Sequence, residues 1–597
     1  MSSIKTNWNL DLLYKSKDDP KMEEDFLISK EIYDNFSKNW AATDLYLSDE
    51  DALLQALNEY EKLVEIPAKP YMYFALALEL DNSNEEIQAK YNRYTDLYTK
   101  LANQVEFFEN RLSKITATNQ QKFLKSEKLK KYHRMLSRIF QKSKHILSED
   151  EEKIINLLHK PAIDNWNSLL EKQIGKIEVN TLTDKNKIEK VNFSQLLNLM
   201  NSTKKEVRDN AAKNLYKKLR NISDIAVEEF NTYLETSKIS RELRGYKSYD
   251  EGRHLKDDIS SEIVNNLIKT VSANKEITHK FFELKANLFK VDKIKYYERN
   301  VPFLLNKEET RIPFEEAVKI VEKSLKSIEP QFSELFIEML EKGQIDVFPK
   351  KNKSPGGFCT MGAKDTPIFI LMNYTDKISD VLTLAHETGH AVHHSFFNKY
   401  QPEFYASASL ATAEVSSTIF EEFVFDGLVK EMPEVEKFEL KLDKVTGSMN
   451  SIFRQVSFYK MEQEFHKEFE KENRVPLTKL NEIFRKHSEE ELGPNVEVIK
   501  GADLSWIYIS HFRRNFYVYS YASGELIARS LKETIKNEKS AGKLIEFMKA
   551  GKSKTTFEIF KDVGIDLSDT KFFQKGIDQI KDEVDELYQL AQKLNLI

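Results

Sequence analysis

The run Ala385-His386-Glu387-Thr388-Gly389-His390 constrains this chain more than any other feature, because its chemistry requires a helix. On a helix, histidines four positions apart point the same way, and both imidazoles can reach one metal ion. Glu387 then flanks the water bound there, in the position of a general base. A chance H-E-x-x-H arises in only about a few of every hundred chains with 12 His and 96 acidic residues. The run therefore predicts a zinc-binding helix.

Turn-forming residues are scarce in this chain. Gly (17) and Pro (14) make up about 5% of the 597 residues, against roughly 12% in average usage. Long elements joined by few turns are typical of a mostly helical protein. A chain of this length is also too long for one compact core, and it predicts two or more packed units with a cleft between them.

Charge and apolar patterning exclude several classes of partner. The net charge is −6 and charged residues of both signs make up 31% of the chain, which argues against nucleic-acid binding. The first residues, 1–7, lack the apolar region of a signal peptide, and no stretch of 18 apolar residues could span a membrane. We expect a cytoplasmic monomer with no membrane partner. Cys359 is the only cysteine, so a metal must be bound by histidine and carboxylate.

Helix starts are marked in the first third of the chain. From about residue 20 to 160, apolar residues recur at spacings of three and four, which is typical of amphipathic helices. Ser148 with Glu151, and Thr203 with Glu206, have the form of capping boxes. We therefore predict that a helix begins at each of these two places.

A β-hairpin is predicted between these two helix starts. Residues 176–179 and 188–191 are short apolar-alternating runs that flank a polar turn. The hairpin is a plausible domain boundary. We expect an N-terminal helical domain over 1–195 and a larger catalytic domain over 196–597, which contains the predicted zinc-binding helix.

One region departs from the helical pattern directly before the metal helix. Residues 348–358 are rich in turn formers, and residues 367–373 follow as a short predicted strand. An edge strand beside a zinc site can bind an extended peptide by backbone pairing, with weak sequence preference. A buried structural strand explains the same residues equally well.

The metal helix is predicted over residues 379–396. Gly389 lies inside it, and glycine there costs about 1 kcal/mol relative to alanine. We therefore expect a packing reason for Gly389, such as the close approach of another backbone.

Two residues compete to be the third protein ligand that a catalytic zinc ion needs. Glu414 lies on a second predicted helix, with Glu421 further along as a possible acceptor for the N–H of a ligand histidine. His393 lies on the metal helix itself. Three ligands at successive turns of one helix span about 10 Å, too far for one ion about 2 Å from each. We therefore favour Glu414.

A tyrosine-rich run follows His511, with Tyr517, Tyr519 and Tyr521 at alternate positions. Taken alone, such a run is more typical of core packing than of catalysis. Beside a zinc site it becomes a candidate for catalysis, because peptide hydrolysis needs donors for the oxyanion that develops.

Together these motifs resemble oligoendopeptidase F, a branch of the thimet-oligopeptidase-like family of zinc metallopeptidases, over nearly the whole chain. The resemblance includes six segments in the family's order, at residues 244–249, 356–359, 373–374, 384–393, 413–417 and 511–524. It implies a mainly α fold, a helical two-part ellipsoid with a deep central channel and a small β-sheet beside the zinc-binding helix. One zinc ion per chain would lie at the floor of that channel.

The resemblance also implies roles for individual residues. His386, His390 and Glu414 match the family's zinc ligands, Glu387 matches its general base, and His511 matches the histidine that assists the tetrahedral intermediate.

Tyr519 is the expected donor to the oxyanion. Tyr517 and Tyr521 are alternatives, because thimet-type relatives place more residues between the histidine and that tyrosine. The strand over 367–372 becomes the edge along which the substrate peptide lies.

These roles predict a zinc-dependent endopeptidase that cleaves internal bonds of short unfolded oligopeptides. A metal-bound water attacks, with Glu387 as general base. A carboxypeptidase or dipeptidyl carboxypeptidase on the same scaffold is the alternative. It would need a cation for the substrate's C-terminal carboxylate, for which Arg513 and Arg514 are candidates. The intact ligands and base argue against a non-catalytic peptide-binding protein.

Overall fold

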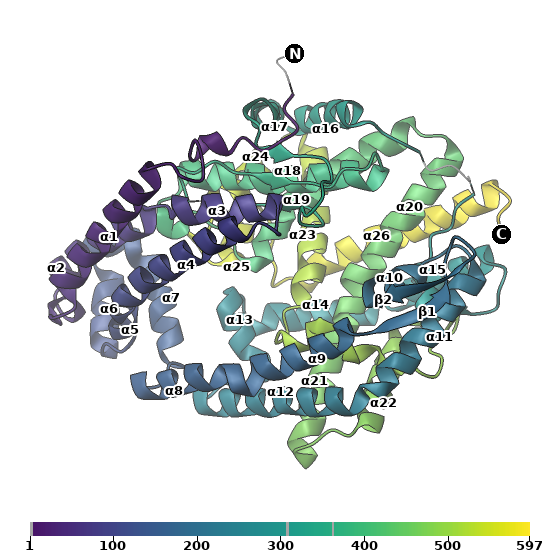
Figure 1. The fold of residues 1–597 in the computed structure, drawn as a ribbon, viewed down its shortest axis with the longest axis horizontal. Coiled ribbons are helices and arrows are strands. Elements are labelled where there is room, and N and C mark those ends of the chain that lie inside the picture. Colours follow the sequence, from purple (N-terminus) through teal and green to yellow (C-terminus); the bar gives the residue numbers. More distant parts are fainter. Residues whose placement is uncertain (1–3, 306–309, 361–362) are drawn as a thin grey trace. The chain divides into compact units, whose positions relative to one another are not determined.

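Helices dominate the computed structural model, which describes residues 4–305, 310–360 and 363–597 (Figure 1). They account for 71% of the structure, and the strands form small sheets of two or three members. The predicted mainly α fold is confirmed, whereas the ellipsoid and its channel stay predictions. Within the described ranges, no helix combines the length and apolar character needed to cross a bilayer.

The chain divides into two compact units, each assembled from three separate stretches. Unit 1 contains Met1–Ile146, Glu309–Lys430 and Leu531–Ile565, and unit 2 contains Leu147–Glu308, Glu431–Ser530 and Asp566–Ile597. The cores of both units are therefore built from segments far apart in sequence. The boundary between 195 and 196 describes contiguous domains and stays a prediction.

Unit 1 is helical apart from one three-stranded sheet. Its N-terminal helices enclose clusters of buried aromatic and aliphatic side chains, among them Phe74 and Phe108. Helices α16, α17, α18 and α24 pack side by side (Figure 1). The helices of this unit are α1 (Lys21–Trp40), α2 (Glu50–Glu65), α3 (Lys69–Leu80), α4 (Glu85–Val105), α5 (Phe107–Ser113), α6 (Ala117–Lys125), α7 (His133–Ser143), α16 (Phe314–Ile328), α17 (Pro330–Lys342), α18 (Ile378–Tyr400), α19 (Leu410–Glu431), α24 (Gly542–Ala550) and α25 (Thr556–Asp562).

The sheet of unit 1 corrects the prediction of a substrate-binding edge at 367–372. Strand β6 (Ile370–Leu371) lies between β4 (Ile345–Asp346) and β5 (Phe358–Cys359), parallel to the first and antiparallel to the second. The edge assignment is wrong because β6 is paired on both sides. Its unbroken run of buried apolar side chains is typical of an interior strand. Strand β5 lies at the edge of the sheet and packs against α18.

Unit 2 contains the predicted hairpin, which is confirmed. Strands β1 (Glu178–Leu182) and β2 (Ile188–Asn192) pair antiparallel and pack on α10 and α11 (Figure 1). A second small sheet joins β3 (Ile294–Lys295) to β7 (Val496–Glu497) in parallel. The helices of this unit are α8 (Glu149–His159), α9 (Asn165–Gly175), α10 (Phe193–Leu199), α11 (Lys205–Asn221), α12 (Ser223–Arg244), α13 (Glu251–Asp257), α14 (Ser261–Ala273), α15 (Glu276–Leu288), α20 (Glu434–Ser448), α21 (Arg454–Glu472), α22 (Leu477–Leu492), α26 (Thr570–Lys593) and the first part of α23 (Tyr519–Glu538).

One of the two predicted capping boxes is present. Ser148 accepts from the backbone N–H of Glu151, whose carboxylate accepts from Ser148 in return. The prediction of a capping box at Thr203 is wrong, because α11 begins at Lys205 without a side-chain cap. The hydroxyl of Ser202 accepts from the N–H of Lys204 and supplies the local turn instead.

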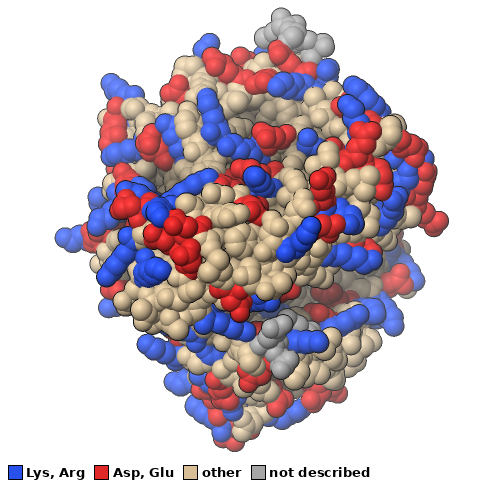
Figure 2. Space-filling model, turned by 90° about the vertical axis from the view of Figure 1, so that its left-hand side faces the viewer, with Lys and Arg blue, Asp and Glu red and all other residues tan. Residues whose placement is uncertain are grey.

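Figure 2 shows one face of the molecule, on which basic and acidic side chains are intermingled. The mixture agrees with the 31% of charged residues and the small net charge of the chain. No single-sign field covers the face that is drawn.

Candidate metal centre and catalytic groups

Helix α18 carries the two histidines of the H-E-x-x-H run. It begins one residue earlier and ends four residues later than predicted, at Ile378 and Tyr400. Asp380 in its first turn accepts hydrogen bonds from the backbone N–H groups of Thr375 and Lys377, which anchors the helix start. His386 and His390 lie one turn apart, with ring centroids separated by 5.0 Å.

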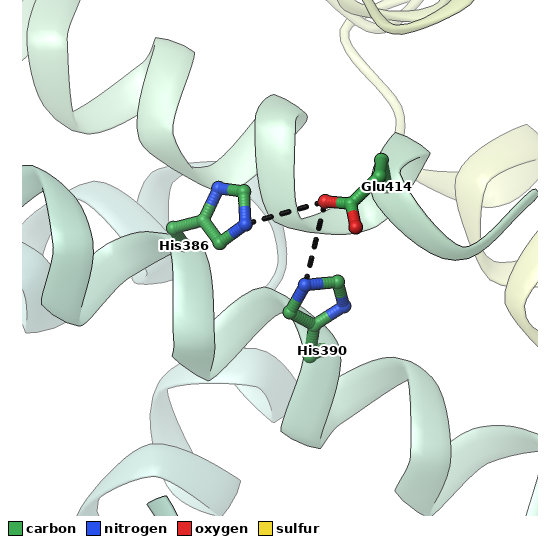
Figure 3. A group of neighbouring side chains, drawn as sticks. All are labelled: His386, His390 and Glu414. Carbon is green, nitrogen blue, oxygen red and sulfur yellow. Dashed lines mark ion pairs between the residues drawn. The ribbon is translucent and has the colours of Figure 1, made fainter. Parts of the chain in front are cut away.

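Glu414, on α19, completes a group of three potential metal ligands (Figure 3). Its Oε2 atom lies 3.3 Å from His386 Nε2 and 3.5 Å from His390 Nε2. Ligand atoms about 2.0–2.2 Å from a tetrahedral zinc ion are about 3.3–3.5 Å apart. The Ser417 hydroxyl, one turn further along α19, lies within hydrogen-bond distance of the Glu414 carbonyl oxygen, at 2.9 Å, and of the same Oε2 atom, at 3.2 Å. The group therefore fits a tetrahedral ion with a fourth position left open.

Gly389 explains how α18 and α19 come close enough to share a metal. A Cβ atom at this position would lie 2.5 Å from Ser417 Cα and 2.7 Å from the carbonyl oxygen of Ser416. The predicted close approach of another backbone is therefore confirmed. Because a backbone cannot yield as a flexible side chain can, only glycine fits here.

Gly389→Ala is expected to push α19 away from α18 and to weaken metal binding at least tenfold. Overpacking of this kind typically costs about 1–3 kcal/mol of stability. Gly447→Ala on α20 is the matched control, since a Cβ there meets no neighbour within 4 Å, and we expect it to be neutral or slightly stabilising. Thermal unfolding and metal content of both variants test this account. Equal behaviour of the two would contradict it.

Glu421 lies in the position predicted for an acceptor behind the metal ligands. Its Oε2 atom is 3.2 Å from His386 Nδ1, on the side of the ring away from Glu414. Burial disfavours the charged ring, but the Glu414 and Glu421 carboxylates outweigh burial and raise the pKa of His386 to about 10. Burial alone would raise the pKa of the Glu414 carboxyl. His386 and His390 outweigh burial and hold that pKa well below its usual range. Without metal, His386 therefore carries a proton at neutral pH.

Metal affinity is expected to rise with pH, because a metal ion must displace the His386 proton. With a pKa of about 10, the linkage of one proton predicts a roughly tenfold fall in the apparent Kd for each pH unit between 7 and 9. Titration with zinc against a chelator of known affinity at several pH values measures this slope. A Kd that is independent of pH would contradict it.

Glu387 is buried, at 7% exposed, on the same helix. Burial raises the pKa of its carboxyl, while His386 and His390 oppose that rise. The nearby backbone N–H of Cys359 also opposes the rise in the pKa of Glu387. The next N–H, of Thr360, donates to Phe369 beside β6, so the Cys359 N–H points outward from the sheet. The outer edge of β5 therefore faces Glu387.

His393, the rival ligand, lies elsewhere on α18. Its ring packs against Phe397 and Phe547, with centroids 5.3 Å and 5.2 Å away. Burial, helped by His394 and His390, lowers its pKa far below the ordinary value. His393 is a neutral core residue, and within the described part of the chain it does not belong to the three-ligand group.

His511 and Tyr517 form a second polar cluster, in unit 2. His511 lies on the short 3₁₀ helix Ser510–Arg513, and its Nδ1 atom makes a short hydrogen bond with the Tyr517 hydroxyl. The Tyr521 hydroxyl lies 3.3 Å from that of Tyr517. Burial, then Arg454 and Arg514, lower the pKa of His511 to about 4, so its ring is neutral at physiological pH.

Tyr519 has different surroundings. Its side chain is fully buried, and its hydroxyl donates to Asp257 Oδ2 at 2.7 Å. Arg253 donates to the same carboxylate oxygen at 2.6 Å, and its guanidinium lies 5.9 Å from the centre of the Tyr517 ring. These contacts count against Tyr519 as an oxyanion donor, because its hydroxyl is committed inside the core.

The two arginines considered for binding a substrate carboxylate differ sharply. Arg513 is paired with the buried Glu229 through Nε and Nη2, at 2.9 Å and 2.7 Å. Its Nη1 also donates to the carbonyl oxygen of Trp506 at 3.0 Å. Arg514 is exposed and interacts with Tyr517. Only Arg514 therefore stays a candidate.

Comparison with known proteins finds two family models and several relatives that match this chain. The model of peptidase family M3 matches residues 198–579, and the model described as oligopeptidase F matches residues 112–178. Oligopeptidase PepF of Bacillus subtilis is 26% identical over 98% of this chain and 87% of its own length. An oligoendopeptidase F homolog of Borreliella burgdorferi is 26% identical over 91% of this chain and 92% of its own.

Solved structures share the fold. A chain from Chlamydophila abortus superimposes with a TM-score of 0.86 at 24% identity, covering 98% of both chains. Oligoendopeptidase-F from Enterococcus faecium gives a TM-score of 0.70 at 21% identity, covering 96% of this chain and 99% of its own. At these identities the likeness is one of fold.

Proposed function

We propose, from the premise that this chain belongs to peptidase family M3, that it is a zinc-dependent endopeptidase that hydrolyses internal bonds of short unfolded peptides. The observation that carries the proposal is the Glu414 oxygen, which lies at ligand-to-ligand distance from both His386 and His390. We further propose that the enzyme acts as a monomer in the cytoplasm, where its cysteine stays reduced.

The donor set suits zinc. Two neutral imidazoles and one carboxylate, with an acceptor such as Glu421 behind one imidazole, are typical of catalytic zinc sites. Bound there, zinc would supply Lewis-acid chemistry, lowering the pKa of water and polarising the scissile carbonyl.

We assign the role of general base to Glu387, which is buried on α18 next to His386. Its carboxylate accepts a proton from the attacking water and returns it to the nitrogen of the leaving amine. Burial raises its pKa toward the operating range, which favours both transfers.

We assign the role of oxyanion donor to Tyr517, which the family resemblance left as an alternative to Tyr519. The Tyr517 hydroxyl is hydrogen-bonded to His511 Nδ1, whereas the Tyr519 hydroxyl donates to the buried side chain of Asp257. We assign the hydrogen of the neutral His511 ring to Nδ1, which donates to the Tyr517 oxygen and leaves the single O–H of Tyr517 free. In this proposal Tyr517 donates to the oxyanion, and His511 holds the Tyr517 hydroxyl in place.

The substrate backbone is proposed to pair with the outer edge of β5. That edge faces Glu387 through the Cys359 N–H, and backbone pairing gives affinity with little dependence on sequence. Such binding suits an enzyme that acts on many unfolded peptides.

A peptide acetylated at its N-terminus and amidated at its C-terminus separates this proposal from exopeptidase action. An endopeptidase cuts it internally and loses that activity with a zinc chelator. A carboxypeptidase that uses Arg514 to hold a free carboxylate leaves it intact. Mass spectrometry of the products decides, and release of residues only from unblocked C-termini would overturn the proposal.

A further inference from the structure

Two successive residues directly before Tyr517 have left-handed backbone conformations. Asn515 has φ of 49° and Phe516 has φ of 54°. Asparagine tolerates this region, but for an aromatic residue it costs about 1–2 kcal/mol, and such conformations persist only where surrounding contacts impose them. The turn links the 3₁₀ helix of His511 to α23, so it decides where the Tyr517 side chain points.

Hydrogen bonds from two other helices hold this turn. The N–H of Phe516 donates to Glu462 Oε1 on α21 at 2.9 Å, and the N–H of Asn515 donates to the Tyr233 hydroxyl on α12 at 3.1 Å. The Phe516 ring is fully buried against Tyr459 and His466, with centroids 5.2 Å and 5.3 Å away. Both backbone donors in the strained segment are therefore satisfied by side chains.

Glu462 has an unusual environment for the carboxyl that accepts from the Phe516 N–H. Its side chain is only 1% exposed, and its second oxygen, Oε2, has no hydrogen-bond partner among the described residues. Burial raises the pKa of its carboxyl well above the ordinary value, although the Phe516 N–H opposes this rise. A protonated carboxyl accepts through its carbonyl oxygen as a glutamine amide does. The Phe516 N–H therefore needs an acceptor of this length, which a glutamine amide would also supply.

We infer that Glu462 is a positioning residue for peptide hydrolysis, which fixes the Asn515–Phe516 turn and thereby directs the Tyr517 hydroxyl onto His511. This inference rests on the proposed function of Tyr517. Without the acceptor, the buried Phe516 N–H would lose its partner, and the turn would relax toward an unstrained conformation. Tyr517 would then leave His511, and stabilisation of the transition state would fall while substrate binding through β5 persisted.

Glu462→Leu and Glu462→Gln form a matched pair for the test. We expect Glu462→Leu to lower kcat at least tenfold, with KM changed less than about threefold and metal content unchanged. Glu462→Gln keeps the acceptor and should retain most of the wild-type kcat. In a Tyr517→Phe background, Glu462→Leu should lower kcat little further, because both changes remove the same contact. Additive losses, equal losses in the Leu and Gln variants, or an unchanged kcat in Glu462→Leu would overturn the inference.

A measurement on the resting enzyme separates this inference from the function on which it rests. The ¹⁵N chemical shift of His511 Nδ1 should move in Glu462→Leu as it does in Tyr517→Phe, and should stay in place in Glu462→Gln. An unmoved shift in Glu462→Leu would overturn the positioning role even if no peptide were cleaved. Conversely, a wild-type kcat in Tyr517→Phe would refute the proposed catalytic role of Tyr517 and leave the shift result standing.

Tyr233→Phe keeps the inference testable if Glu462→Leu does not fold. It removes only the hydroxyl that accepts from the Asn515 N–H and leaves the packing of the ring intact. We expect a smaller loss of kcat, about threefold, with the same direction of the His511 shift. An unchanged kcat together with an unmoved shift would count against the strained turn as the positioning element.

Discussion

Glu387→Gln is expected to lower kcat for peptide hydrolysis by about 10²- to 10⁴-fold, the range typical for loss of a general base. Glutamine fills the same space, but its amide cannot take a proton from the attacking water. The metal ligands are untouched, so each chain should still bind one metal ion. Steady-state kinetics and metal analysis on the same preparation measure both quantities.

Glu403→Gln is the control for this substitution. Glu403 is also a carboxyl whose pKa is raised by burial. It accepts a hydrogen bond from the backbone N–H of Lys364 at 3.2 Å. It is no member of the three-ligand group, and we expect its variant to have wild-type kcat. Near-normal turnover in Glu387→Gln would remove Glu387 from the mechanism, and loss of metal would make its role structural.

Tyr517→Phe is expected to lower kcat by about 10²- to 10³-fold, the typical effect of losing one oxyanion donor. KM should change little, because the hydroxyl acts on charge that exists only in the transition state. Removing the hydroxyl also takes away the hydrogen-bond partner of His511 Nδ1.

Tyr519→Phe provides the contrast for this prediction. It removes a buried hydrogen bond to Asp257, so we expect a loss of stability of about 1–3 kcal/mol. Its kcat should fall much less than that of Tyr517→Phe. Kinetics and thermal unfolding of both variants test the assignment. The reverse order of kcat values would restore Tyr519 as the donor and exclude Tyr517.

The metal-binding helix could be predicted from sequence because its signals are local. The spacing of His386 and His390 determines where their rings point, and a glycine inside a helix indicates close packing against a neighbouring backbone. The structure supplies the reason for Gly389 in the backbone of Ser416 and Ser417. Glu414 could be identified as the third ligand only from the ligand count of zinc and the family resemblance, because no local sequence pattern links it to α18.

The sheet and the tyrosine cluster could not be predicted in the same way. Strand order depends on pairings between distant segments, so residues 367–373 could not show whether they lie at an edge. Alternation of Tyr517, Tyr519 and Tyr521 does not tell which hydroxyl lies beside His511. That depends on Asp257, Glu462 and a left-handed turn at Phe516, a residue type that rarely adopts this conformation.

The most direct test of the account is a zinc titration of chelator-treated protein, followed by metal content and by internal cleavage of the doubly blocked peptide. We predict that both rise together and reach a plateau at one zinc ion per chain. His390→Ala, which removes one of the three ligands, should show neither rise under the same conditions. Full cleavage by the metal-free protein, or zinc-restored cleavage in His390→Ala equal to wild type, would contradict the central claim that His386, His390 and Glu414 hold the metal that hydrolysis requires.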